Sequence, residues 1–256
     1  LAASVGSYAP LAFLVCAIAV GSIAICFAEG GSRVPTSGGA YGCIETAFGP
    51  LAGYVAGSML WFSDLRAGGG IAAALGDVAS SVVAHEWQPA TRTAVVVLSV
   101  ASIAFVNVLG VAQGARLVTV AAIVKLVPLV VFVVVGAAFV DGANFVDTLP
   151  PATEDFGRAL ILALFTFTGM ETSLCASGEV REPSRTIPRA IAIAMLSLTF
   201  IYIGVQIVAQ GVLGASLATS TAPLADAMAR VNPALRVLMV AGAAISMLGW
   251  LGSDIL

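Results

Sequence analysis

The chain has 256 residues, of which 59% are hydrophobic and only 10% are charged, and its mean hydropathy is +1.04. Because soluble globular domains carry about 25% charged residues, this composition excludes a soluble protein and predicts an all-α integral membrane protein. The formal net charge of −3 gives no basis for a nucleic-acid partner, so the partner that the composition implies is the lipid bilayer.

Seven apolar segments are long enough to cross a bilayer as helices. A hydrocarbon core of about 30 Å needs roughly 20 helical residues. The predicted spans cover 9–30, 51–76, 93–111, 117–140, 157–178, 188–213 and 234–256. The first begins close to the start of the chain and the last reaches its end. We therefore expect one transmembrane domain, residues 1–256, that is truncated at both ends.

Two short helices are predicted outside the spans. After the first span, Pro35 and Gly38-Gly39 interrupt the helix, and aromatic and apolar residues then recur at helical spacing from Tyr41 to Phe48. This pattern is typical of a short helix at the membrane interface. The stretch TAPLADAMARV at 221–231 predicts a second short helix, either re-entrant or interfacial.

The second and fourth spans contain charged residues at membrane depth. Asp64 and Arg66 are about 200° apart on a regular helix, so they cannot pair directly. Lys125 lies about eight residues into its span, roughly 12 Å deep. Ionisable residues at such depths indicate function by default. The structural alternatives are that Asp64 pairs with Lys125 or with another helix, and that the lysine stem extends outward to the interface.

The fifth span is the most unusual. It places Thr166, Thr168 and Gly169, followed by Met170 and Glu171, at the depth of the lipid tails. Glycine is costly in the middle of a helix, and loosened backbone is tolerated inside a bilayer only where it faces protein or a watery cavity. We predict that this helix is broken near residues 166–170 and lines a binding site.

The sequence offers little support for chemistry at this site. The four cysteines lack the spacing of a metal or redox site, so neither a metal nor a cofactor is predicted. Asp64 and Glu171 as an intramembrane acid pair would be the only enzymatic alternative, and no metalloprotease or serine-hydrolase motif accompanies them. We therefore predict that the protein is not an enzyme.

Three motifs, in order, resemble those of the amino acid–polyamine–organocation (APC) superfamily. The first runs from Glu29 to Pro50, and the second runs from Asn107 to Arg116 with Lys125 in the next helix. The third is Phe165-x-Phe167-x-Gly169-x-Glu171 with the charged loop after it; that loop contains Glu179, Pro183, Arg185, Pro188 and Arg189. The resemblance covers most of the chain, from the second helix of the family into the eighth.

The resemblance implies a fold and an activity. The fold is a LeuT-like arrangement of two inverted five-helix repeats, with a binding site at the midplane formed by broken helices. The first helix of that fold would lie outside this chain. The implied activity is secondary active transport of an amino acid or related amine across the cell membrane, by symport or antiport and with proton coupling as one option. The alternative is a transport-inactive sensor or scaffold on the same fold.

The resemblance also implies roles for individual residues. Thr166, Thr168, Gly169 and Met170 would form an unwound hinge that holds the substrate, and Phe165 would be an aromatic gate over it. Asp64 and Gly68 would approach the substrate from another helix. Glu171 would orient the hinge or take part in proton coupling. Lys125 would replace a bound sodium ion, which argues against a sodium symporter. The alternatives are packing roles for the glycine and the phenylalanine, and a structural ion pair for Glu171.

Overall fold

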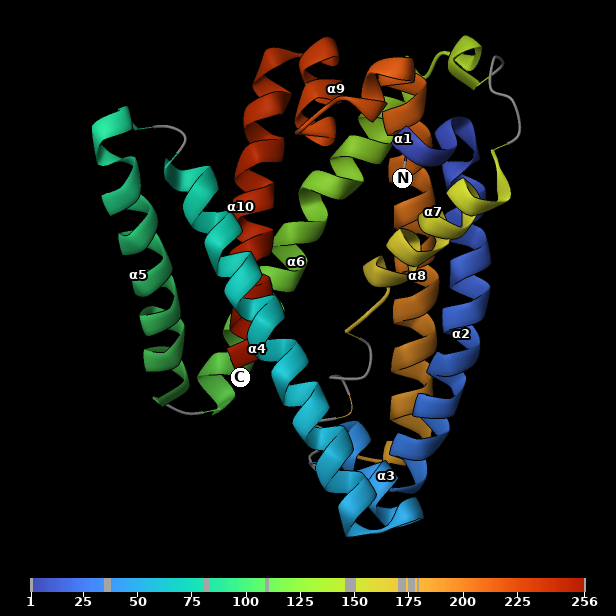
Figure 1. The fold of residues 1–256 in the computed structure, drawn as a ribbon, viewed down its shortest axis with the longest axis vertical. Coiled ribbons are helices and arrows are strands. Elements are labelled where there is room, and N and C mark those ends of the chain that lie inside the picture. Colours follow the sequence, from blue (N-terminus) through green and yellow to red (C-terminus); the bar gives the residue numbers. More distant parts are fainter. Residues whose placement is uncertain are drawn as a thin grey trace. The chain divides into compact units, whose positions relative to one another are not determined.

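The computed structural model describes every residue except 1, 35–37, 81–82, 109–110, 146–150, 170–173, 175–177, 179 and 256. The described part is helical (Figure 1). In chain order its elements are α1 (Ala2–Val5), η1 (Gly6–Tyr8), α2 (Ala9–Arg33), α3 (Gly39–Phe48), α4 (Pro50–Ser80), η2 (His85–Trp87), α5 (Gln88–Val108), α6 (Val111–Gly136), η3 (Ala137–Phe139), η4 (Gly142–Phe145), α7 (Thr153–Thr166), α8 (Pro183–Leu213), η6 (Gly214–Ala218), α9 (Pro223–Val231) and α10 (Pro233–Ile255).

The helices form two compact units. The first unit contains Leu1–Met59 and Phe132–Val231, and the second contains Leu60–Val131 and Asn232–Leu256. Helices α4 and α6 contribute residues to both units. The first unit therefore holds α2, α3, α7, α8 and α9, and the second holds α5 and α10.

Among the described residues, five helices are long and apolar enough to cross a membrane. They cover Gly6–Arg33, His85–Val106, Thr119–Phe139, Pro183–Ala218 and Pro233–Gly252, and they match five of the seven predicted spans. The other two predicted spans differ for separate reasons. Helix α4 is continuous over 31 residues, but its charged residues and glycines lower its hydropathy. Helix α7 ends after only 14 residues.

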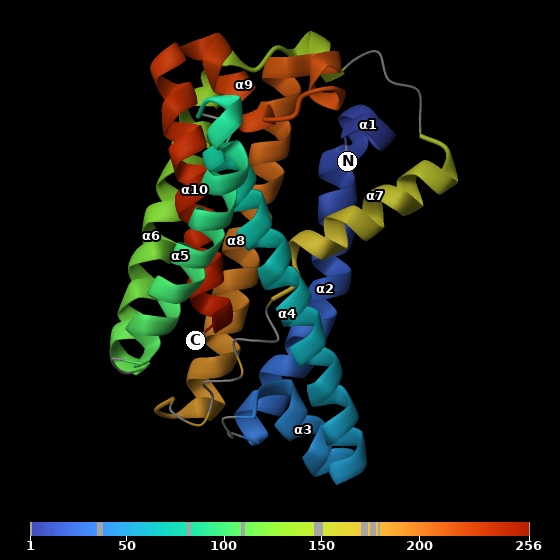
Figure 2. The same cartoon turned by 60° about the vertical axis from the view of Figure 1, so that its left-hand side comes forward.

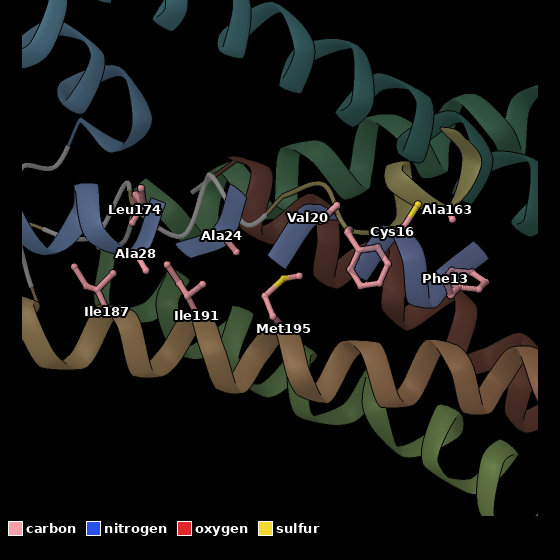
Figure 3. Close-up of a cluster of buried hydrophobic side chains, with 11 residues drawn as sticks. Phe13, Cys16, Val20, Ala24, Ala28, Ala163, Leu174, Ile187, Ile191 and Met195 are labelled. Carbon is pink, nitrogen blue, oxygen red and sulfur yellow. The ribbon is translucent and has the colours of Figure 1, made fainter. Parts of the chain in front are cut away.

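Helices α2 and α8 form the core of the first unit and lie side by side in both views (Figure 2). They are antiparallel, because Phe13 near the start of α2 packs on Tyr202 late in α8, whereas Gly31 near the end of α2 faces Ile187 at the start of α8. Small and medium side chains recur on α2 every four residues, which lets the two backbones approach. This stripe consists of Cys16, Val20, Ala24 and Ala28, and Figure 3 shows it facing Ile187, Ile191 and Met195.

Both predicted short helices are confirmed. Helix α3 (Gly39–Phe48) packs on the start of α4, where Gly57 leaves room for the Tyr41 ring. Helix α9 (Pro223–Val231) is held to the end of α8 by Arg230, whose guanidinium donates to the carbonyl of Val212 at 2.8 Å. The same guanidinium also donates to the Ser216 hydroxyl at 2.6 Å. The last carbonyls of a helix lack intrahelical donors, and Arg230 supplies a donor to one of them at the end of α8.

The second unit is built around α10. Glycines on α10 allow a close approach to α6: a side chain at Gly242 would collide with Pro128, and one at Gly249 would collide with Ala121. On its other side α10 shares a buried cluster with α4 and α5, formed by Ala72, Leu75, Ile103 and Leu251. An ion pair at 2.5 Å joins Asp77 near the end of α4 to Arg92 in the first turns of α5.

Candidate substrate site at a helix break

The break predicted in the fifth span is present. Helix α7 ends at Thr166, and its 14 residues extend only about 21 Å, which is too short for a hydrocarbon core of about 30 Å. Phe167 caps the helix end with its N–H directed at the carbonyls of Leu164 and Phe165. Gly169 follows with a φ of +104°, a conformation that glycine adopts at little cost and other residues avoid. This local geometry ends the helix inside the predicted span.

One face of the break is packed against the helix core. Ala159, Ala163 and Phe167 recur every four residues on this face, and Phe167 is only 3% exposed. The Phe167 ring lies 6.5 Å from the Phe13 ring of α2 and 5.3 Å from the Tyr202 ring of α8, edge to face in both cases. The end of α7 is therefore held by an aromatic contact with both core helices.

The other face of the break is exposed. Phe165 is 72% exposed, and Thr168 and Gly169 are exposed as well. A side chain built at Gly169 would meet no atom within 4 Å. Glycine is thus required at this position by its backbone conformation and not by crowding. The predicted gate Phe165 and the predicted hinge residues Thr168 and Gly169 are thus exposed, whereas Thr166 is half-buried.

The end of α7 presents hydrogen-bond acceptors. The Thr166 hydroxyl donates to the Ala163 carbonyl at 2.6 Å, and the Thr168 hydroxyl donates to the Phe165 carbonyl at 2.8 Å. Each hydroxyl has one proton, so towards a ligand these two oxygens act as acceptors only. The C-terminal end of a helix also carries a partial negative charge. Together these features favour a cationic group such as an ammonium over a carboxylate.

The predicted site residues Asp64, Gly68 and Lys125 lie in the second unit. On α4, Asp64 and Gly68 are half-buried and share one face with the packed residues Ala72 and Leu75, because all four follow three- and four-residue spacing. Arg66 is exposed on another face of α4, as its angular separation from Asp64 on a regular helix predicts. The structure therefore brings Asp64 and Gly68 together on the packed side of α4.

Lys125 lies on the side of α6 that meets α10. It is half-buried, four residues after Ala121 and three before Pro128, and both of these residues face glycines of α10. Positions at this spacing share a helix face. The lysine thus follows the α6–α10 contact stripe of the second unit.

Two predicted site residues, Met170 and Glu171, lie outside the described residues. The packing role of Phe167 was not predicted, although it is now a prominent feature of the break. The sequence did contain a signal for it, because alanine, alanine and phenylalanine at positions 159, 163 and 167 continue one stripe of α7. A two-residue step along the chain separates the packed Phe167 from the exposed Phe165.

Apolar spanning helices together with a broken helix define the class: a multi-pass protein of the cell membrane built like a transporter. Comparison with known families makes the assignment specific. A family model described as "Amino acid permease" matches residues 1–253. The chain belongs to this amino acid permease family, which confirms the resemblance to the APC superfamily; the family is named for transport and not for an enzymatic reaction.

Several characterised and uncharacterised relatives are similar over most of the chain. A cadaverine/lysine antiporter of Escherichia coli is 30% identical over 87% of this chain and 51% of its own length. An uncharacterized transporter of Mycobacterium tuberculosis is 34% identical over 95% of this chain and 54% of its own length. The serine/threonine exchanger SteT of Bacillus subtilis is 27% identical over 74% of this chain and 43% of its own length. The chain spans about half the length of these relatives.

Proposed function

We propose that this chain is part of a secondary active transporter that moves an amino acid or a related amine across the cell membrane by alternating access. The observation that carries the proposal is the break after Thr166, where two threonine hydroxyls donate to helix carbonyls next to Gly169 with its positive φ. With their protons used in this way, the two hydroxyl oxygens can only accept hydrogen bonds from a ligand. Every α-amino acid and every polyamine carries the ammonium that such a site suits. The named relatives exchange amino acids or an amino acid for an amine, which supports the same substrate class.

The direct test is uptake by the complete protein in liposomes. The panel contains neutral, cationic and acidic amino acids and polyamines, each with and without a pH gradient. We expect saturable uptake of at least one amine-bearing solute and none of its uncharged analogue without the ammonium. Ligand binding without uptake would instead favour a transport-inactive sensor or scaffold on this fold. An absence of both binding and uptake across the panel would contradict the proposal.

Asp64 is proposed to select the charge of the substrate side chain. It is half-buried on the packed face of α4, and its carboxylate would attract a cationic group of the substrate. If this attraction selects the substrate, Asp64→Asn should raise the KM for a cationic amino acid or polyamine by about tenfold or more, equivalent to roughly 1.4 kcal/mol, and leave neutral substrates within about twofold. Arg66→Gln on the exposed face is the control. Unchanged uptake of cationic substrates by Asp64→Asn would remove this role.

Lys125 is proposed to couple uptake to protons. Its position on the α6–α10 contact stripe places a basic group beside the contact between two helices of the second unit. We expect Lys125→Ala to keep measurable exchange but to lose most of the stimulation by an inward proton gradient. The measurement is initial uptake at matched internal pH, with and without the gradient. Full gradient stimulation in the variant would show that the coupling group lies elsewhere.

A further inference from the structure

Gln206 on α8 is half-buried, and it carries a buried side-chain nitrogen that the proposed site does not use. Among the described residues, its side-chain nitrogen Nε2 is buried and has no hydrogen-bond acceptor. Nearby polar groups on the same helix are satisfied: Gln210 is 5% exposed, and its Nε2 donates to the carbonyl of Asn144 at 3.2 Å. A buried amide donor without an acceptor is unfavourable, and such a group in a native structure calls for an explanation.

The position of Gln206 links it to the break. It follows Tyr202 by four residues and Ile203 by three, so it shares their face of α8. Tyr202 and Ile203 both pack against the buried cluster that α2, α7 and α8 form, and the Tyr202 ring contacts Phe167 at the end of α7. Gln206 thus lies about one turn, roughly 6 Å, along α8 from the contact that holds the break.

We propose that Gln206 is a positioning residue of the transport cycle: its amide gains an acceptor in a second arrangement of α8 against α2 and α7. This proposal rests on the proposed function, because alternating access requires two such arrangements. The arrangement described here then leaves the amide unsatisfied, and the second arrangement satisfies it. An unsatisfied donor raises the free energy of the state that contains it and so shifts the equilibrium towards the other state.

The chain offers a matched pair of variants for the test. Gln206→Met replaces the amide with an apolar side chain of similar size where no hydrogen bond is lost. Gln210→Met makes the same change one turn later, where the hydrogen bond to Asn144 is lost. Both are introduced into the complete protein, and the melting temperature in detergent and the kinetics of uptake are measured. Gln206→Asn, which keeps a shorter amide, serves as the conservative variant.

We expect Gln206→Met to raise the melting temperature by a few degrees, whereas Gln210→Met lowers it. The maximal uptake rate of Gln206→Met should fall about tenfold with KM unchanged or lower, because one arrangement becomes too stable, and Gln206→Asn should recover part of the rate. A lower melting temperature or an unchanged rate for Gln206→Met would overturn the proposal. If the wild type transports nothing, the proposed function fails, and the direction of the two melting-temperature changes still decides whether the amide is unsatisfied.

Discussion

Replacing Phe167 with alanine should destabilise the protein and abolish most transport. The ring is 3% exposed and contacts rings of both α2 and α8, so truncation leaves a cavity at the point where the end of α7 is anchored. Core phenylalanine truncations cost about 3–5 kcal/mol in soluble proteins. Inside a bilayer the transfer from water contributes less, and we therefore expect a smaller cost, about 2–3 kcal/mol. The melting temperature of the purified protein and its uptake rate measure the two effects.

Phe165→Ala is the matched control for this prediction. The same residue type two positions earlier is 72% exposed, and truncation there removes little packing. We expect its melting temperature to stay within a degree or two of the wild type. If Phe165 covers the substrate, the KM of the Phe165→Ala variant for that substrate should nevertheless rise several-fold. Equal losses of stability in the two variants would contradict the assignment of one packed and one exposed face.

Gly169→Ala should have the second large effect, and it acts through the backbone. The φ of +104° is strained for any residue with a Cβ, at a cost of about 1–3 kcal/mol, while the space around the position is open. We expect the turn to shift to relieve this strain, which moves the carbonyls and hydroxyls of the break away from the ammonium. Uptake should fall by about tenfold or more, as expected for a loss of roughly 1.4 kcal/mol of transition-state stabilisation.

Gly157 provides the control for the backbone argument. It lies within α7, its φ is not positive, and a side chain there would likewise meet nothing within 4 Å. Alanine is favoured over glycine inside helices by about 0.5–1 kcal/mol, so Gly157→Ala should be neutral or slightly stabilising with normal uptake. Similar behaviour of Gly157→Ala and Gly169→Ala would show that the turn does not depend on the positive φ.

The break itself could be predicted from the sequence because its causes are local. A glycine and two threonines within an apolar span change helix propensity and backbone hydrogen bonding at the point where they occur. The same is true of α3 and α9, whose prolines and glycines mark their starts. Helix length was harder to predict, since hydropathy continues through Phe165 and Phe167 although the helix ends between them.

The packing around the break could not be predicted in the same way. Which of two nearby phenylalanines faces the core depends on how α7 rotates against α2 and α8, and that rotation is set by tertiary contacts such as those of Phe13 and Tyr202. The sequence did indicate part of the answer, because apolar residues recur every four positions on α7 and the last of them is Phe167. The glycines that allow α6 to approach α10 near Lys125 lie on α10, more than a hundred residues further along the chain. The surroundings of Lys125 therefore depend on the fold, and the sequence of α6 alone does not predict them.

The exposed face of the break can be tested directly by cysteine accessibility in the complete protein lacking its native cysteines. Single cysteines at Phe165 and Thr168 should react with a charged, membrane-impermeant thiol reagent, and a transported solute should protect them. A cysteine at Ile18, an exposed apolar position on α2, is the lipid-facing control and should react little. If positions 165 and 168 resist the reagent as position 18 does, the turn after α7 faces lipid, and the break is not a substrate site.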